Sequence, residues 1–399
     1  MIKLIPIAKL QVGMYIHDLN CAWIKHDFLR NSFLVDSEKT LQKIFALGIQ
    51  EIYIDASQGM DVDDAPTLEE VNRAVDRQID AIADRGNAPP RIVTLGEERQ
   101  RARKLHVEAN RIVSGMMRDI RLGKQIEIEQ IEPMVEHIVD SIFRQQDALL
   151  PLAQLKNHDE YTFQHSVSVC ALMTTFARAM DMTRDVIHEI AIGALLHDVG
   201  KATVPDKILN KPGKLTDEEF LQMKSHVVQS KIILENTLGI SPIALTVAAQ
   251  HHERYDGSGY PNQLKGKDIS CYGQMSAIVD VYDAITSDRC YHKGIPPTEA
   301  LRKILEWSKF HFNPDLAQVF IRALGIYPTG SLVRLESGRL AIVEEQHPDR
   351  IMLPKVRTIF HVRGHYLKPE IIDLRYSQDR IVGYESFEQW KIDPARWKN

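Results

Sequence analysis

The stretch HHERYDGSGYP, residues 251–261, places two adjacent histidines directly before a glycine-rich loop. The apolar residues that precede it, IALTVAAQ, predict a buried helix, so the two imidazoles lie at the end of that helix. Neighbouring histidines are an unusual choice for packing alone, because a buried imidazole needs a hydrogen-bond partner or a metal ion. We therefore interpret this stretch as part of a chemical site.

The chain around this stretch is predicted to be helical from about residue 127 to residue 326. Thr216 and Glu219 form the pattern of a capping box, which marks the start of one helix. The expected helical segments are 133–150, 161–180, 186–200, 218–234, 243–252, 273–286 and 298–308.

The predicted helices carry histidines and aspartates among apolar neighbours. Taken singly, each histidine has a simple explanation, an imidazole whose hydrogen bonds are satisfied in or near the core. Together, five imidazoles and two carboxylates buried near one another have a large desolvation cost unless they are hydrogen-bonded or coordinate metal. A helical bundle with inward-facing histidines and carboxylates is a known way to build a metal site. The residues are His165, His197, Asp198, His226, His251, His252 and Asp280.

The N-terminal part has a different character. Residues 1–62 predict a small α+β domain with two strands separated by a turn at Gly13. A helix capped by Ser37 and ended by Gly48 is expected next, followed by a strand at 51–55.

Residues 63–126 predict a helical connector. In its second half the apolar residues Ala102, Leu105, Ala109, Ile112 and Met116 recur at spacings of 3 and 4, which gives about two heptads and is too short for a coiled coil. Two interpretations remain: a helix that packs on the following domain, or a helix that also contributes to a homodimer.

Residues 329–399 predict a β-rich extension. A hairpin is expected at 332–346 across Ser337 and Gly338, and two further β segments at 355–362 and 380–385. The whole chain therefore predicts a mainly α protein: an all-helical bundle at 127–328, with a small α+β N-terminal domain and a short β-rich C-terminal extension.

Composition limits the classes of function. The net charge of -5 gives no overall attraction to a nucleic acid polymer or to anionic lipid. No apolar run approaches the roughly 18 residues of a membrane span, and the first residues do not resemble a signal peptide. The cysteines form no CxxC pair, which argues against a zinc ribbon and a disulfide framework. We expect a cytoplasmic protein. The cysteines are Cys21, Cys170, Cys271 and Cys290.

The motifs of the helical part resemble a known family. The sequence HDVGK, residues 197–201, followed by HHxxxDGxGYP at 251–261, resembles the HD-GYP branch of the HD phosphohydrolase superfamily. The similarity runs from about His158 to Pro328 and includes DxYDAxTSDR at 280–289. The first 130 residues resemble the accessory domain of unknown function that often precedes HD-GYP. The resemblance implies an HD-type bundle and a phosphodiesterase that opens cyclic di-GMP to linear pGpG and, in a second step, to GMP.

The resemblance also implies a metal centre. It assigns ligand roles to all seven histidines and aspartates named above, with Asp198 as the bridge between two divalent transition metal ions. Imidazole and carboxylate ligands without thiolate suit iron, manganese, nickel or zinc, and the resemblance favours iron or manganese. Two adjacent cations stabilise the entering and the leaving oxygen of a phosphodiester and lower the pKa of a bound water.

Substrate contacts are implied for two cationic residues and for the loop. Lys201 is expected to act with Asp198 in catalysis by placing its ammonium against a phosphate oxygen, and Arg289 is expected to bind phosphate or guanine. Where the family has a lysine three residues after this arginine, the chain has His292. The resemblance therefore leads us to expect cyclic di-GMP as the substrate, with a related cyclic dinucleotide such as mixed cyclic GMP-AMP as the alternative.

The loop is expected to shape the nucleotide pocket. Gly257 and Gly259 would allow positive φ and a close approach to a ligand. Tyr260 would offer an aromatic face for guanine, and Pro261 would stiffen the exit. The alternatives are a surface turn or a docking surface for a partner such as a diguanylate cyclase domain.

A further departure concerns the number of metals. Some relatives have a glutamate four residues before the first histidine, which helps to hold a third metal, and here that position is Tyr161. We therefore expect two metals. A weakly catalytic receptor for cyclic dinucleotides is the alternative from another class, but every expected ligand position is filled by a competent residue.

Overall fold

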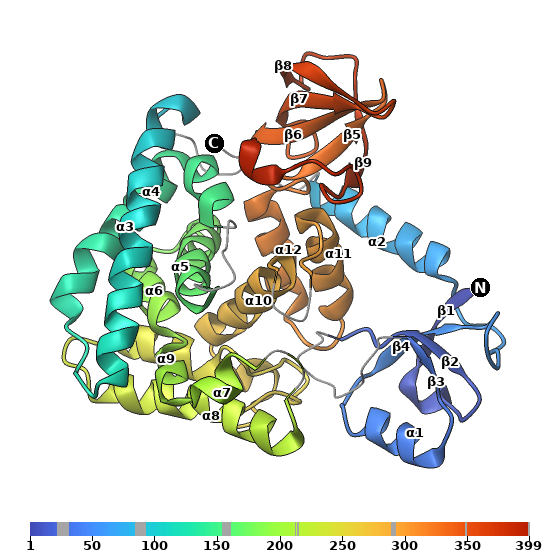
Figure 1. Ribbon diagram of the computed structural model, residues 1–399, viewed down its shortest axis with the longest axis horizontal. Helices are drawn as coiled ribbons and strands as arrows, with labels where there is room; N and C mark the ends of the chain where they lie inside the picture. The colour runs from blue at the N-terminus through green and yellow to red at the C-terminus, as the bar shows by residue number, and fades with distance from the viewer. Residues whose placement is uncertain are drawn as a thin grey trace. The chain divides into compact units, whose positions relative to one another are not determined.

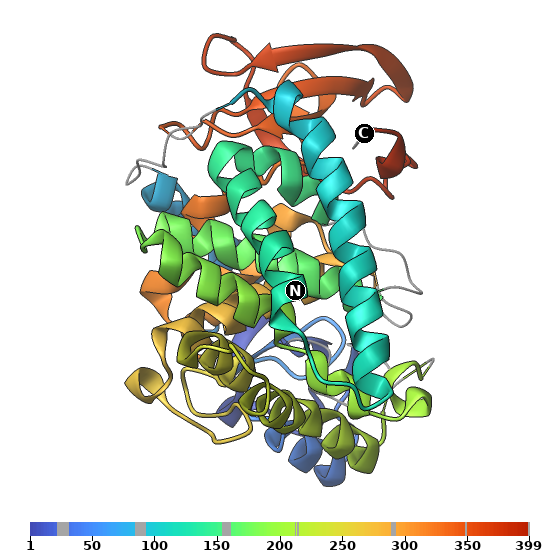
Figure 2. The ribbon, with the colours of Figure 1, turned by 90° about the vertical axis from the view of Figure 1, so that its left-hand side faces the viewer.

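The computed structural model describes residues 1–21, 32–83, 93–153, 161–211, 213, 215–288, 293–347 and 349–397. They form two compact units, one of Met1–Ala81 with Gly213–Phe220 and one of Ile82–Pro212 with Leu221–Asn399. Figures 1 and 2 show the chain coloured from blue at the N-terminus to red at the C-terminus. The sequence range of the second unit includes all the predicted site residues.

The first unit contains the predicted α+β fold. Its strands form one antiparallel sheet in the order β1-β4-β2-β3, so the strands on either side of the Gly13 turn are separated by β4. Isoleucines of the sheet and of α1 fill its core. The elements that begin in this part of the chain are β1 (Ile2–Pro6), β2 (Tyr15–Asp18), β3 (Phe33–Leu34), α1 (Glu38–Phe45), β4 (Glu51–Asp55) and α2 (Leu68–Ala83).

The local signals in this unit are confirmed. The side chain of Ser37 caps α1 by accepting a hydrogen bond of 3.3 Å from the N–H of Thr40. Gly13 and Gly48 have φ values of +96° and +66°, which glycine adopts without a steric cost.

The second unit is a helical bundle that is extended by a sheet (Figure 1). Helix α5 packs against α4, α6 and α10, and α9 packs against α6 and α10. The site residues lie on these central helices and on α8. The helices are α3 (Leu95–Arg121), α4 (Ile128–Ala153), α5 (Tyr161–Ala179), α6 (Arg184–Leu196), α7 (Asp206–Leu209), α8 (Asp217–Glu235), α9 (Pro242–Gln250), α10 (Cys271–Thr286), α11 (Pro297–Trp307) and α12 (Pro314–Leu324).

Two sequence features explain how this bundle is built. The predicted capping box begins α8: the N–H of Thr216 donates to Glu219 at 2.7 Å, and the N–H of Glu219 donates to the Thr216 hydroxyl at 3.3 Å. Gly193 lies where α6 meets α9, and a Cβ there would be 2.7 Å from the backbone of Ala244. Only glycine allows the two helices to approach this closely.

The apolar seam predicted for the connector is correct in its first half and wrong in its second. Helix α3 runs beside α4 (Figure 2) and buries Ala102, Leu105 and Ala109 as expected. After Ala109 the buried positions are Val113 and Met117 instead of Ile112 and Met116. A straight helix has 3.6 residues per turn, so a strict alternation of 3 and 4 drifts off the packed face.

The C-terminal sheet is antiparallel, with strand order β8-β7-β6-β5-β9. The predicted hairpin is the pair β5–β6. Strand β8 was not predicted, because it is an edge strand with mostly exposed side chains and contains Pro369, so it lacks an apolar alternation. The strands are β5 (Leu332–Leu335), β6 (Arg339–Glu345), β7 (Lys355–His361), β8 (His365–Asp373) and β9 (Ile381–Glu385).

Buried polar contacts join this sheet to the bundle. Asp147 of α4 accepts hydrogen bonds from the Thr329 hydroxyl at 2.7 Å and from the N–H of Gln346 at 3.0 Å. Nearby, Arg144 of α4 donates two hydrogen bonds of 2.8 Å to the buried carboxylate of Glu98 on α3.

The predicted fold class, mainly α with small β regions, is confirmed. The division of the chain at residues 62, 126 and 328 stays a prediction.

Candidate metal centre

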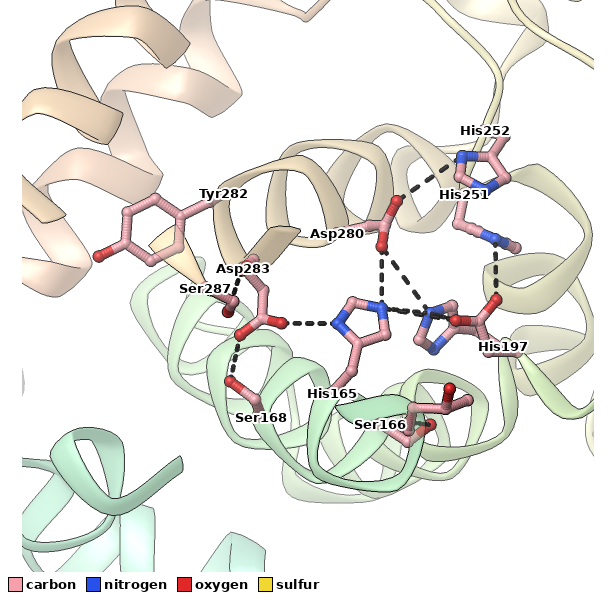
Figure 3. A network of polar contacts seen from close by, with 12 residues as sticks. His165, Ser166, Ser168, His197, His251, His252, Asp280, Tyr282, Asp283 and Ser287 are labelled. Atoms are coloured by element: carbon pink, nitrogen blue, oxygen red, sulfur yellow. Dashed lines mark hydrogen bonds and ion pairs between the residues drawn. The ribbon is translucent and has the colours of Figure 1, made fainter. Parts of the chain in front are cut away.

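The structure brings all seven predicted ligands to one point in the bundle core. Each comes from a central helix or from a helix end: His165 from α5, His197 and Asp198 from the end of α6, His226 from α8, His251 and His252 from the end of α9, and Asp280 from α10. Six of them are buried and His252 is half-buried. Figure 3 shows His165, Asp280 and the paired histidines pointing toward one another.

Three of the histidines are oriented by their own helices. The Nδ1 atoms of His197, His226 and His251 lie 2.7, 2.6 and 2.8 Å from the carbonyl oxygen three residues earlier. A carbonyl can only accept a hydrogen bond, so Nδ1 carries the proton in each ring and Nε2 carries the free lone pair. All three Nε2 atoms therefore enter the cluster as ligand atoms.

The ligands form overlapping groups, two of which have no residue in common, and the third joins them through His197, Asp198 and His251. His165, His197 and Asp280 form the first group: Nε2 of His165 lies 3.1 Å from Asp280 Oδ1 and 3.2 Å from Nε2 of His197. His226, His251 and His252 form the second group, with ligand atoms within 4.8 Å of one another.

Asp198 lies between the two groups and offers one oxygen to each. Its Oδ2 is 3.5 Å from Nε2 of His165 and 3.3 Å from Nε2 of His197. Its Oδ1 is 3.2 Å from Nε2 of His226 and 3.9 Å from Nε2 of His251. This arrangement is what a carboxylate that bridges two cations requires.

The donor set fits a pair of metal ions. Asp198 Oδ1, His226 Nε2 and His251 Nε2 are buried and have no hydrogen-bond partner among the described residues. Buried polar atoms are rarely left in this state, because each one costs about 1–3 kcal/mol. Lone pairs that face one another at such distances repel, and a cation between them turns this repulsion into attraction.

Protonation of the cluster follows from burial and from the two carboxylates. Burial, together with the nearby His197, lowers the pKa of His251 to about 3, and burial with the neighbouring His251 lowers the pKa of His252 well below its usual value. Both rings are therefore neutral near pH 7, as ligation requires. The pKa of His197 shifts the other way. Burial lowers it, but the negative charges of Asp198 and Asp280 outweigh burial and raise the pKa above its usual value.

Lys201 and Gly200 complete the HD segment. The ammonium of Lys201 lies 2.5 Å from Asp198 Oδ2, so it is next to the first group. Gly200 belongs to the short 3-10 helix η4 (Val199–Thr203), and a Cβ there would lie 2.0 Å from the carbonyl oxygen of His226. Glycine at this position allows Asp198, in the turn between α6 and η4, to come close to His226 of α8.

In the loop after the paired histidines, the predicted positive φ is found at Gly257 and not at Gly259. Gly257 has a positive φ of +86°, as expected. Gly259 does not. It is required by space, since a Cβ there would lie 2.4 Å from the N atom of Arg254 and 2.6 Å from the carbonyl oxygen of His252. Its close neighbour in the structure is thus the backbone of the histidine segment.

Tyr260 makes close contacts inside the protein. Its ring stacks on His252 with a centroid distance of 4.7 Å, and the ammonium of Lys224 lies 5.3 Å from its centroid. The half-buried ring therefore supports His252 directly, and its role toward guanine stays a prediction. Pro261 is exposed, whereas Arg289 and His292 lie outside the described residues.

Two buried carboxylates near the site were missed by the sequence reasoning. Glu253 accepts hydrogen bonds from the N–H groups of Asn262 at 2.8 Å and Leu264 at 3.0 Å, and so closes the loop after Pro261. Asp283 lies 2.6 Å from Nδ1 of His165. The motif that contains Asp283 was visible in the sequence, and its spacing of three residues from Asp280 was the available signal.

Gly259→Ala should destabilise the protein by about 1–3 kcal/mol, the usual cost of forcing an extra carbon into a filled space. The new Cβ must push the backbone of Arg254 away from the loop. Denaturant unfolding measures the change, and Ser258→Ala is the control because Ser258 is the exposed neighbour. An unchanged unfolding midpoint for Gly259→Ala would show that the loop has room to relax.

Comparisons with known proteins agree with this site. A family model described as a domain of unknown function (DUF3391) matches residues 2–131, and one described as an HD domain matches residues 150–316. The HD domain implies binding of divalent metal ions, and the ligand groups described above are candidates to hold them. Among the described residues no helix has the length and apolar character needed to cross a membrane.

The chain is 42% identical over 396 residues to the cyclic di-GMP phosphodiesterase PA4108 of Pseudomonas aeruginosa, which covers 98% of this chain and 94% of that protein. It is 35% identical over 196 residues to a cyclic di-GMP phosphodiesterase of Thermotoga maritima, covering 47% and 53% of the two chains. It is 40% identical over 127 residues to the 3′3′-cGAMP-specific phosphodiesterase 2 of Vibrio cholerae, covering 32% and 24%. The chain therefore belongs to the HD-GYP family, as a member in which a DUF3391 domain precedes the HD domain.

Proposed function

We propose that this protein is a metal-dependent phosphodiesterase that opens cyclic di-GMP to linear pGpG. The observation that carries the proposal is the position of Asp198 between two groups of buried ligand atoms, with one oxygen facing each group. The near full-length similarity to a cyclic di-GMP phosphodiesterase supports the same substrate class. We place the protein in the cytoplasm, where it acts on a soluble second messenger.

Two divalent transition metal ions are proposed, one for each ligand group, with Asp198 shared. The first ion would be held by His165, His197 and Asp280, and the second by His226, His251 and His252. Imidazoles and carboxylates suit iron, manganese, nickel or zinc, and the similarity to the HD-GYP family favours iron or manganese among them. When bound, the two ions would neutralise phosphoryl oxygens and make hydroxide available near pH 7.

The remaining roles belong to side chains around the centre. Lys201 places a cation beside Asp198, where it would meet the phosphoryl oxygen that gains negative charge during hydrolysis. Arg289, which lies outside the described residues, would bind phosphate or guanine. The loop at 257–261 would form one wall of the pocket. Its exposed face would also bind diguanylate cyclase domains. Separately, α3 would contribute to a homodimer.

Mixed cyclic GMP-AMP (3′3′-cGAMP) is a candidate second substrate, because several relatives are named as 3′3′-cGAMP-specific phosphodiesterases. One of them is 40% identical over 127 residues. The sequence has His292 where the family has a lysine, which changes the charge at this position of the motif and supports the same alternative.

The test is anaerobic purification and metal analysis, followed by assays with cyclic di-GMP and 3′3′-cGAMP before and after removal of metal with a chelator. We expect two metals per chain, faster hydrolysis of cyclic di-GMP, and loss of activity on chelation that is restored by manganese or iron. Protein that holds two metals but hydrolyses neither compound would refute the enzymatic function. Faster hydrolysis of 3′3′-cGAMP would establish the alternative substrate.

We expect pGpG to accumulate before GMP forms. Linear pGpG has a terminal phosphate with about one more negative charge than a diester, and two cations neutralise this charge less well than three. Tyr161, at the position of the third-metal glutamate in some relatives, limits the centre to two. A time course resolved by chromatography measures the products. GMP that forms without detectable pGpG would contradict the two-metal argument.

A further inference from the structure

His165 has a carboxylate beside each of its two ring nitrogens. Its Nε2 lies 3.1 Å from Asp280 Oδ1, and its Nδ1 lies 2.6 Å from Asp283 Oδ2. Asp280 and Asp283 are three residues apart on α10, so they share one face of that helix. Figure 3 shows the ring of His165 between the two aspartates.

Asp283 is itself fixed from several sides. Its side chain is fully buried, and its second oxygen accepts a short hydrogen bond from the hydroxyl of Ser168, one turn after His165 on α5. The Ser287 hydroxyl donates to its backbone carbonyl at 2.6 Å. One carboxylate therefore ties two residues of α5 to α10, and these are the two helices that supply His165 and Asp280.

This contact determines the form of the imidazole. A carboxylate accepts hydrogen bonds, and Nδ1 of His165 lies nearer to Asp283, at 2.6 Å, than Nε2 lies to Asp280, at 3.1 Å. In the metal-binding form of the ring, Nδ1 therefore carries the proton toward Asp283 and Nε2 presents its lone pair to the first ligand group. The other three buried histidines of the candidate centre, His197, His226 and His251, are oriented by backbone carbonyls three residues earlier, which no side-chain substitution can remove. His165 depends on a side chain that lies 118 residues further along the chain.

We infer that Asp283 is a positioning residue that controls the first metal site selectively. It fixes the ring orientation and tautomer of His165 and makes its Nε2 a stronger ligand, which is the usual effect of a carboxylate behind a metal-binding histidine. The second group, His226, His251 and His252, does not contain His165 and should be independent of Asp283. The inference rests on the two-metal centre of the proposed function.

The test uses Asp283→Asn, which keeps the shape but removes the charge. Its amide can turn either way. With the oxygen toward His165 the hydrogen bond is weaker, and with the nitrogen toward His165 the ring proton must move to Nε2 and block the ligand atom. We expect the affinity of one of two metal ions to fall by about 10- to 100-fold, while the other stays within about twofold.

The measurement is calorimetric titration of the metal-free full-length protein with Mn²⁺ under anaerobic conditions, with circular dichroism to confirm folding. Ser168→Ala is the matched control, because it removes a different hydrogen bond of the same carboxylate and leaves the contact with His165. We expect this variant to bind both ions within about threefold of the wild type. If Ser168→Ala weakens one ion as strongly as Asp283→Asn, the effect belongs to local packing and the inference is wrong.

The outcomes separate the inference from the proposed function. Wild-type protein that binds fewer than two Mn²⁺ ions would contradict the two-metal centre itself. Wild-type protein that binds two ions, together with an Asp283→Asn variant that binds both equally well or loses both equally, would overturn the selective role of Asp283 alone.

Discussion

Asp198→Ala is expected to lose both metal ions and to reduce the rate of cyclic di-GMP hydrolysis by at least about 1000-fold, which corresponds to about 4 kcal/mol of lost transition-state stabilisation. The reason is geometric. One oxygen of Asp198 faces His165 and His197, and the other faces His226 and His251. Removal of this carboxylate takes an anionic ligand from both groups at once.

Metal analysis of the purified variant and an assay with cyclic di-GMP check this result. Asp198→Asn should behave similarly, because an amide keeps the shape but offers only one oxygen and no negative charge. Asp206→Ala is the matched control: it removes an exposed carboxylate eight residues away that pairs with Arg121. An Asp198→Ala variant that keeps two metals and its turnover would remove the basis of the proposed centre.

Lys201→Ala is expected to keep both metals and to lower kcat by about 100-fold. A single well-placed donor to a developing negative charge contributes roughly this much to catalysis. The ammonium of Lys201 lies 2.5 Å from Asp198, so it is next to the centre, but an ammonium has no lone pair with which to bind a cation. Its loss should therefore affect turnover and leave the metal content unchanged.

The measurement is a comparison of kcat and metal content between Lys201→Ala and the wild type. Lys207→Ala is the control, because it removes an exposed lysine six residues further along the chain. If the metal content of Lys201→Ala falls with its activity, Lys201 holds the structure of the HD segment. Equal kcat values for the variant and the wild type would exclude a catalytic role.

The sequence by itself predicted which residues come together at the candidate metal centre. His197 and His251 end apolar helices, and local signals such as the capping box at Thr216 were confirmed in detail. These features depend on residues within a few positions of one another, and hydrogen bonds to the carbonyl three residues earlier are equally local. Motif and periodicity therefore predicted the mainly α fold, the family and the candidate ligands.

Only the tertiary structure decided how these residues share their contacts. The division of Asp198 between two ligand groups, the contact of Asp283 with His165 and the space that requires Gly259 join segments that the chain order does not relate by any period. The burial of Val113 instead of Ile112 in α3 has the same origin, because the face that packs follows the helical repeat of the real helix. Such contacts are set by how helices cross and how closely backbones approach, and hydrophobic periodicity contains no information about either.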